Sequence, residues 1–258
     1  MITSTANDTV KHIMTLVKNA KARRKEGLFV IEGERMAREV PEEILKDCFV
    51  SEDFPLKARL DEVFGYDVNP VEVTSNVFKK MSDTMSPQGI LCVCRQQAHT
   101  VGEIVGPDPD RQLRLLILEG IQDPGNLGTM IRSAEGAGFD AVIADDNTVD
   151  VYNPKVTRST MGSLFRVPVI YTPDLPGTVD MIKDASVTVY AAHLKGSISY
   201  REEKYPKRTA FLIGNEGAGL SDAICGRADK LIKIPMQGKL ESLNAAVAAS
   251  LLMFGVND

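Results

Sequence analysis

The sequence is poor in the residues that build metal centres and disulfide scaffolds. Only 4 cysteines and 3 histidines occur in 258 residues, and no two cysteines form a CxxC pair. A chain with so few grouped ligands is not expected to hold a structural metal or to depend on disulfides. Cys92 and Cys94 alternate within the apolar stretch ILCVC, which places both on one face of a predicted strand. We therefore expect buried thiols and no metal site.

Long hydrophobic runs are also absent. The longest largely apolar stretch, Leu243 to Val256, contains Asn244 and Ser250 and is too short to cross a bilayer. The amino-terminal residues MITSTANDTVKH lack the basic flank and apolar centre of a secretory signal. The sequence thus predicts a cytoplasmic protein with no membrane partner.

No charge of one sign dominates the chain as a whole. It is 43% hydrophobic and 25% charged, as in ordinary globular proteins, and its formal net charge of -5 argues against a globally basic nucleic-acid binder. The segment from residue 11 to residue 25 is different, because it contains cations and no acid. These cations are Lys11, Lys18, Lys21, Arg23, Arg24 and Lys25. The segment predicts a helix with either a solvated charged face or a phosphate-binding patch.

The distribution of apolar runs and turn residues predicts two α/β domains. In the first part, strands are predicted at 28–33, 48–51, 71–73 and 89–94, and helices at 33–45, 56–64 and 75–83. Pro, Gly and Asp then crowd together without a periodic pattern, which is typical of a linker. We predict a first domain over residues 1–98, a linker over 99–112 and a second domain over 113–258.

The second domain has the pattern of an open, mostly parallel sheet. Continuous apolar runs, typical of strands covered on both faces, alternate there with helical stretches. The runs lie at residues 113–119, 139–144, 167–171, 187–192, 208–214 and 230–235.

Three glycine-rich polar loops of this domain, 119–138, 213–221 and 234–250, follow predicted strands. Ligands of open parallel sheets bind beyond the carboxyl ends of the strands. The glycines Gly120, Gly125 and Gly128 do not give GxGxxG, and Asn126 and Leu127 stand where a P-loop requires Lys and Ser or Thr. A Rossmann dinucleotide site and a P-loop are therefore not predicted, and each loop alone is more typical of a helix cap or tight turn.

Taken together, the loops carry three ordered motifs. Asn126, Gly128, Arg132 and Ala134 form N-x-G-x-x-x-R-x-A, and GNEGAGLS and IPMQGKLESLNAAVAA follow at later strand ends. In order and spacing they resemble the motifs of the SpoU/TrmH group of RNA 2′-O-ribose methyltransferases, within the SPOUT superfamily. The stretch RKEGLFVIEGERMARE (24–39) resembles the small ribosomal-protein-like αβα substrate-binding domain often fused to them. Ala245 and Ala246 depart from the Val-Ser of many relatives but keep the side chains small.

The resemblance implies a trefoil-knotted sheet that binds S-adenosylmethionine and a reaction at a ribose 2′-hydroxyl. The positions that match the family's cofactor contacts are Gly214, Ile234 and Leu243, with Met236 beside them. The additional ribosomal-protein-like module favours 23S ribosomal RNA as substrate, with transfer RNA as the alternative. A non-catalytic RNA-binding or assembly factor is the other alternative. It is disfavoured by the intact catalytic set Asn126, Arg132, Glu216, Ser242 and Asn244.

The resemblance also implies a role for each polar motif residue. Arg132 either acts as the base or holds the adjacent phosphate and stabilises the developing alkoxide, a task suited to a guanidinium fork. Asn126 would hold the ribose or Arg132, and Glu216 would orient a donor or the loop. Ser242 and Asn244 would bond RNA or cofactor, although Ser242 also stands where a helix N-cap is expected.

The last helix carries small and apolar side chains around much of its circumference. One buried face does not require so many, so a second surface is expected to cover them. Relatives with this motif generally dimerise here. The expectation is a homodimer through the C-terminal domain, in which Arg132 of one chain serves cofactor held by the other.

Overall fold

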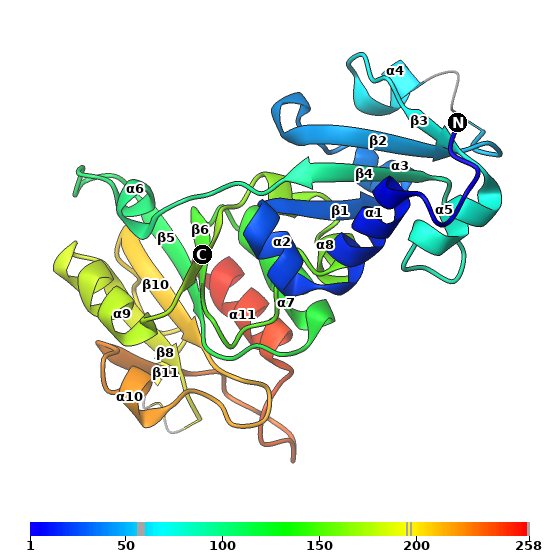
Figure 1. Ribbon diagram of the computed structural model, residues 1–258. Helices are drawn as coiled ribbons and strands as arrows, with labels where there is room; N and C mark the ends of the chain where they lie inside the picture. The colour runs from blue at the N-terminus through cyan, green and yellow to red at the C-terminus, as the bar shows by residue number, and fades with distance from the viewer. Residues whose placement is uncertain (56–59, 195, 197, 257–258) are drawn as a thin grey trace. The chain divides into compact units, whose positions relative to one another are not determined.

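The computed structural model describes residues 1–55, 60–194, 196 and 198–256, and these form two compact units (Figure 1). The first unit comprises Met1–Gln97 together with Asp150–Phe165, and the second comprises Ala98–Val149 together with Arg166–Asp258. The segment of residues 150–165, which the sequence placed in the second domain, thus packs within the first unit. No helix in the described part of the chain is long and apolar enough to cross a membrane.

The first unit is built on a mixed four-stranded sheet. Its strands are β1 (Leu28–Glu32), β2 (Leu45–Ser51), β3 (Val71–Val73) and β4 (Ile90–Arg95), in the order β1-β4-β2-β3. Strand β4 runs antiparallel to β1 and β2, whereas β2 and β3 are parallel. Cys92 and Cys94 are fully buried on β4, as predicted, and burial raises the pKa of Cys94.

Helices cover both faces of this sheet. They are α1 (Asp8–Lys18), α2 (Ala20–Glu26), α3 (Glu34–Ala37), α4 (Leu60–Phe64), α5 (Ser75–Met81) and α8 (Pro154–Thr160). Leu28 and Val30 face a core shared with α1 and α5. Phe29, on the opposite face of β1, contacts the rings of Tyr152 and Phe165. This layering matches the αβα arrangement expected for the domain.

One predicted helix of this unit is wrong. The sequence predicted a single helix over 33–45, but α3 ends at Ala37, a 3₁₀ turn (Glu42–Ile44) follows, and β2 begins at Leu45. The cause is Pro41, which lacks a donor N–H and disfavours helical backbone at the preceding residue. Residues 56–59 of another predicted helix lie outside the described residues, and its remainder forms α4.

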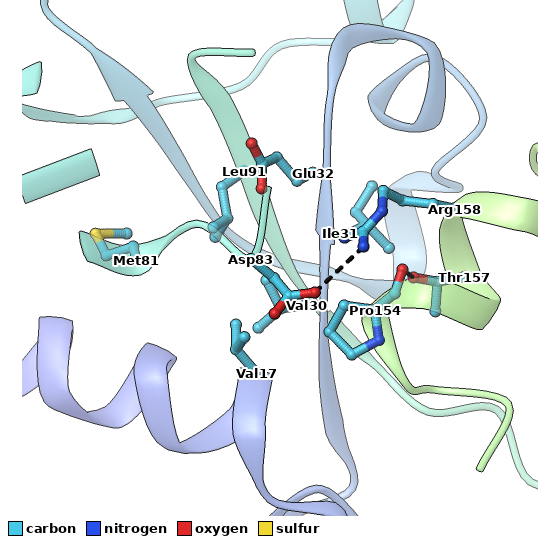
Figure 2. A pocket seen from close by; sticks show the side chains of 10 residues that line it. All are labelled: Val17, Val30, Ile31, Glu32, Met81, Asp83, Leu91, Pro154, Thr157 and Arg158. Atoms are coloured by element: carbon cyan, nitrogen blue, oxygen red, sulfur yellow. Dashed lines mark hydrogen bonds and ion pairs between the residues drawn. The ribbon is translucent and has the colours of Figure 1, made fainter. Parts of the chain in front are cut away.

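The inserted segment 150–165 packs directly on β1. Figure 2 shows Pro154 and Arg158 of α8 around a small cavity that Val30 of β1 also lines. Arg158 forms an ion pair with Asp83 across this cavity, with 3.2 Å between Nη2 and Oδ2. The first unit is therefore completed by a segment that lies in the chain between the two parts of the second unit.

The second unit is a seven-stranded sheet in which every neighbouring pair is parallel. Its strand order is β7-β6-β5-β10-β8-β11-β9. The strands are β5 (Leu113–Leu118), β6 (Ala141–Asp145), β7 (Val169–Thr172), β8 (Thr188–Ala192), β9 (Ile198–Ser199), β10 (Arg208–Ile213) and β11 (Lys230–Lys233). Six correspond to the predicted apolar runs, and the two-residue β9 was not predicted.

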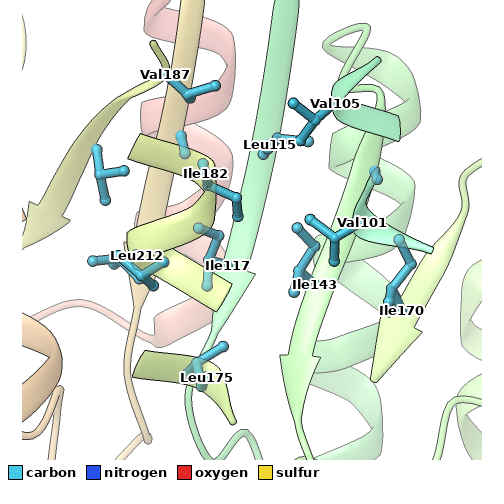
Figure 3. Close-up of a cluster of buried hydrophobic side chains, with 14 of the residues drawn as sticks. Val101, Val105, Leu115, Ile117, Ile143, Ile170, Leu175, Ile182, Val187 and Leu212 are labelled. Atoms are coloured by element: carbon cyan, nitrogen blue, oxygen red, sulfur yellow. The ribbon is translucent and has the colours of Figure 1, made fainter. Parts of the chain in front are cut away.

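Five helices complete this unit and make it a three-layer α/β/α structure. They are α6 (Val101–Val105), α7 (Pro124–Gly136), α9 (Leu175–Asp184), α10 (Asp222–Cys225) and α11 (Ala245–Gly255). One face of the sheet packs against α6, α9 and α10, through the apolar cluster of Figure 3. On the other face, α11 packs against α7 and β10. Helix α6 lies within the predicted linker, and Val101 and Val105 anchor it in the core.

The strand order creates a switch point between β5 and β10. From β5 the chain passes through α7 to β6 on one side, whereas from β10 it passes through α10 to β11 on the other side. Connections that leave two adjacent parallel strands in opposite directions open a crevice at their carboxyl ends. The loops after β5 and β10 border this crevice, and both carry predicted motifs.

Candidate active site

Hydrogen bonds join the three motifs at this edge of the sheet. Asn244 is the N-cap of α11, and its Oδ1 accepts from the N–H groups of Ala246 (2.9 Å) and Val247 (3.2 Å). Its Nδ2 then donates to Asn126 Oδ1 (2.9 Å), and Asn126 Nδ2 donates to Glu216 Oε1 (2.9 Å). One polar chain therefore fixes the amide orientations of both asparagines.

Glu216 is the acceptor at the end of this chain. Its carboxylate also accepts from the backbone N–H groups of Gln122 and Asp123, each at 3.2 Å. Partial burial acts to raise the pKa of Glu216, but the hydrogen bond from Asn126 and those from backbone N–H groups outweigh burial and lower the pKa below its usual value. Glu216 is thus an ionised acceptor that orients the loop after β5.

The structure does not bring Ser242 and Arg132 into this chain. Ser242 is exposed and forms no hydrogen bond with the described residues. The N-cap role expected for Ser242 belongs to Asn244. Arg132 lies in the second half of α7, exposed and with no hydrogen bond or ion pair to the described part of the chain. Its guanidinium is therefore available to a group from outside this chain.

Gly214 follows β10 directly and allows a close approach of the backbone. A Cβ at this position would lie 2.2 Å from the carbonyl carbon of Gly219 and 2.2 Å from the nitrogen of Leu220. Asn215 and Gly219 exchange two backbone hydrogen bonds there (3.1 and 2.9 Å). The shape of the loop itself therefore requires glycine at position 214.

The predicted cofactor residues Ile234 and Met236 follow β11, and Leu243 precedes α11. All three are half-buried apolar side chains. The backbone between residues 234 and 243 forms no hydrogen bond with the described residues. Apolar cover beside unpaired backbone donors and acceptors fits an adenosine moiety, so these residues suit S-adenosylmethionine.

The predicted RNA-binding cations divide into two groups. Most have exposed side chains: Lys11, Lys18, Lys21, Arg24 and Lys25. Arg23 is only 3% exposed, donates to the carbonyl oxygens of Leu16 (2.7 Å) and Val17 (3.1 Å), and pairs with Asp150 Oδ2 (2.6 Å). The prediction for Arg23 is therefore corrected, because a buried guanidinium with these partners cannot reach a phosphate.

Several residues that shape the site were missed by sequence reasoning. Glu119 accepts from the N–H (2.8 Å) and hydroxyl (2.7 Å) of Ser221, which ties the loop after β5 to the N-cap of α10. Asn215 Oδ1 accepts from the N–H groups of Gly217 (2.9 Å) and Ala218 (3.0 Å). Glu119 and Ser221 are 102 residues apart, and no spacing rule pairs them. The bonds of Asn215 are local turn bonds of a kind that an Asn side chain can make two and three residues on.

Comparison with known proteins agrees with this geometry. The SpoU rRNA Methylase family matches residues 114–254, which is more than half of the chain. The chain belongs to this family. An MRM3-like substrate binding domain matches residues 7–92. The family assignment predicted from the motifs, and the second domain type beside it, are thereby confirmed.

Relatives that span the whole chain have the same family membership. The 23S rRNA (guanosine(2553)-2′-O)-methyltransferase RlmP of Bacillus subtilis is 34% identical, over 98% of this chain and 97% of its own length. A crystal structure of an RNA 2′-O ribose methyltransferase superposes with a TM-score of 0.82 at 31% identity, covering 99% of this chain and 97% of that one. The S-adenosylmethionine-bound rRNA methyltransferase of Sinorhizobium meliloti has a TM-score of 0.83 at 28% identity, over 99% and 96%.

As a SpoU family member, the protein is an RNA 2′-O-ribose methyltransferase that uses S-adenosylmethionine. The predicted enzyme class, cofactor and two-domain α/β fold are confirmed. The trefoil knot and the roles of the individual site residues stay predictions.

Proposed function

We propose that the protein methylates a ribose 2′-hydroxyl of 23S ribosomal RNA, in the cytoplasm. The observation that carries the proposal is the polar chain from Asn244 through Asn126 to Glu216, which assembles all three motifs at one sheet edge. The full-length relative from Bacillus subtilis is described as acting on 23S rRNA, and the substrate-binding domain at residues 7–92 supports an RNA substrate.

Bound S-adenosylmethionine supplies an activated methyl group on its sulfonium. The half-buried side chains of Ile234, Met236 and Leu243, with the unpaired backbone beside them, would hold its adenosine part. Gly214 would keep the adjacent loop close to the cofactor. No charged side chain is needed for this recognition, because backbone groups supply the hydrogen bonds.

Arg132 is the residue proposed to act on RNA. Its exposed and unpaired guanidinium can hold the phosphate next to the target ribose through two N–H groups and stabilise the alkoxide as it forms. The network of Asn126, Glu216 and Asn244 would hold the loop that receives the ribose, and Ser242 would bond RNA or cofactor. Positioning of this kind can supply several kcal/mol of the barrier, and reaches about 7–11 kcal/mol in well-oriented intramolecular reactions.

The first unit is proposed to supply RNA affinity through its exposed cations, Lys11, Lys18, Lys21, Arg24 and Lys25. They lie on α1 and α2, where few acidic groups oppose them. Lys11 pairs with Asp8 at 3.1 Å, but both side chains are largely exposed, so the pair is weak.

The catalytic unit is proposed to work as a homodimer. Val247, Leu251 and Phe254 lie on one side of α11 and are 47%, 36% and 49% exposed. With Thr129 of α7 and the segment 200–205 they line a wide groove. A second copy of this chain is the proposed occupant, because a self-complementary contact would cover these apolar side chains and bring the exposed Arg132 of the adjacent α7 to the partner.

Ribose methylation of purified RNA tests the substrate. The protein and labelled S-adenosylmethionine are incubated with unmodified 23S rRNA, 16S rRNA and transfer RNA, and methylated riboses are mapped by their resistance to alkaline cleavage. The expected result is one strong site in 23S rRNA, and the nucleotide equivalent to guanosine 2553 is examined first. Methylation of transfer RNA alone would replace the proposed substrate by its alternative.

Matched substitutions test the dimer. Leu251→Glu places a charge in the apolar groove, whereas Met181→Glu places one on α9 at a similarly exposed apolar residue (45%). Sedimentation should show two chains for the unmodified protein and for Met181→Glu at micromolar concentration, and one chain for Leu251→Glu. A fully active monomer at nanomolar concentration would contradict the proposal.

A further inference from the structure

The loop after β5 is held from both sides at a single glycine. Gly120 has a φ of +68°, a turn conformation that favours glycine. Its N–H donates to Asp145 Oδ1 (2.8 Å), and its carbonyl oxygen accepts from Asn215 Nδ2 (2.7 Å). Asp145 ends β6 and Asn215 follows β10, the two strands that flank β5.

The buried carboxylate of Asp145 holds this turn through its Oδ1. It is 8% exposed, and the same Oδ1 accepts from the hydroxyl of Thr148 (2.7 Å), while Oδ2 accepts from Asn147 Nδ2 (3.1 Å). Thr148 Oγ1 in turn accepts from the N–H of Ile121 (3.2 Å). A charged acceptor with several donors makes stronger hydrogen bonds than a neutral one.

The turn that Asp145 holds leads directly into the catalytic loop. The N–H groups of Gln122 and Asp123, two and three residues after Gly120, donate to the Glu216 carboxylate. Asp123 also caps α7, with Oδ1 accepting from the N–H of Asn126 (2.8 Å). A shift of Gly120 would therefore move the N-terminal end of α7 and Asn126 with it.

We propose that Asp145 and Asn215 are positioning residues that clamp the Gly120 turn and thereby set the place of Asn126 and Glu216 for methyl transfer. The proposal rests on the proposed function and adds two residues to it. Asp145 acts indirectly, because none of the hydrogen-bond partners given above belongs to the proposed cofactor or RNA contacts. Its loss should lower kcat and leave the affinity for S-adenosylmethionine nearly unchanged.

The chain offers a matched control for Asp145. Asp140 precedes β6, and its Oδ2 accepts from the N–H of Arg114 on β5 (2.8 Å). It therefore links the same two strands by the same kind of bond, but at the amino ends, away from the motif loops. Asp140→Ala removes a comparable structural bond without touching the clamp.

The test compares Asp145→Ala, Asp145→Asn and Asp140→Ala in the full-length protein. Asp145→Ala should lower kcat on 23S rRNA about 100-fold, as expected for a small misplacement of reacting groups. Asp145→Asn keeps an oxygen acceptor for Gly120 and should restore most of kcat, and Asp140→Ala should leave kcat unchanged. If Asp145→Ala does not fold, Asn215→Asp takes its place. This variant loses the amide donor to the Gly120 carbonyl oxygen and should lower kcat in the same way.

Hydrogen exchange of backbone amides separates this proposal from the proposed substrate. Asp145→Ala should speed exchange over residues 119–126 and Asp140→Ala should not, whether or not 23S rRNA is methylated. If the unsubstituted protein leaves 23S rRNA unmethylated, the proposed substrate is contradicted, but the clamp is not. Equal losses of kcat in the two alanine variants, or unchanged exchange over 119–126, would overturn the clamp.

Discussion

Arg23 on α2 and Arg132 on α7 carry the same guanidinium in opposite surroundings. Arg23 is 3% exposed and is bonded to two backbone carbonyls and Asp150, whereas Arg132 is exposed with no partner in the described chain. A cation whose three guanidinium nitrogens all donate to partners inside the fold stabilises the fold. A cation without partners on a motif helix is available for a ligand, and this difference separates a structural arginine from a functional one.

The largest expected effect follows from removing Arg23. Arg23→Ala leaves the largely buried Asp150, at 11% exposure, without its counter-charge, and breaking a buried pair costs about 3–5 kcal/mol. Urea unfolding should show a loss of this size, because α2 and the inserted segment 150–165 both depend on the pair. Arg24→Ala, at an exposed neighbour, should change stability by less than about 0.5 kcal/mol. Equal losses of unfolding free energy in Arg23→Ala and Arg24→Ala would contradict a structural role specific to Arg23.

Arg132 should show the reverse pattern. Arg132→Ala should lower turnover about 100- to 1000-fold, with unfolding free energy and cofactor affinity nearly unchanged, because the side chain contacts nothing that the fold needs. Arg132→Lys should also fail, since an ammonium keeps the charge but not the two-pronged geometry. Single-turnover methylation and calorimetry with S-adenosylmethionine measure the two properties separately. Near-normal activity of the lysine variant would refute a bidentate phosphate contact.

A smaller effect is expected from the exposed cations around Arg23. Replacing Lys21, Arg24 and Lys25 by Gln should reduce the slope of log affinity for RNA against log salt by about 2, if each contacts one single-stranded phosphate. Filter binding over a range of salt measures the slope. Arg38→Gln is the control, because Arg38 already pairs with Glu34 at 2.5 Å. An unchanged slope in the triple variant would show that these cations are only solvated.

The smallest effect concerns Glu216. Its lowered folded-state pKa means that its stabilisation is complete above the ordinary Glu value, about 4.3, and is lost as pH falls below that value through the folded pKa. Unfolding measured between about pH 3 and pH 6 should therefore decline less steeply in Glu216→Gln than in the unsubstituted protein. Parallel pH profiles would contradict the ionised acceptor at the end of the polar chain.

Sequence patterns predicted much of the fold, because the burial of a strand or helix restricts which residue types can occur along it. The apolar runs of the second unit correspond to β5, β6, β7, β8, β10 and β11, since strands covered on both faces must be continuously apolar. Strand β9 was not predicted, because its two residues are too few to show a hydrophobic pattern. The helix expected over 33–45 is wrong because Pro41 interrupts it.

The motif residues were also identified in advance, but not their connections. Asn126, Glu216 and Asn244 are recognisable by resemblance, yet their mutual hydrogen bonds span 90 and 118 residues of sequence. Asp145 lies outside the motif loops, and Glu119 lies in one of them without being a motif residue. Their importance comes from the strand order, which places β6 and β10 on either side of β5.

The sequence alone predicted the alternation of strands and helices and carried the motifs that resemble the enzyme family, because both are residue types at fixed spacing along the chain. The cofactor followed from that resemblance. Only the tertiary structure decided that Arg23 is internal, that residues 150–165 complete the first unit, and that the Gly120 turn is held by Asp145 and Asn215. Each of these outcomes depends on which distant groups meet in space. Burial and hydrogen-bond satisfaction depend on these tertiary contacts, and no local sequence pattern encodes them.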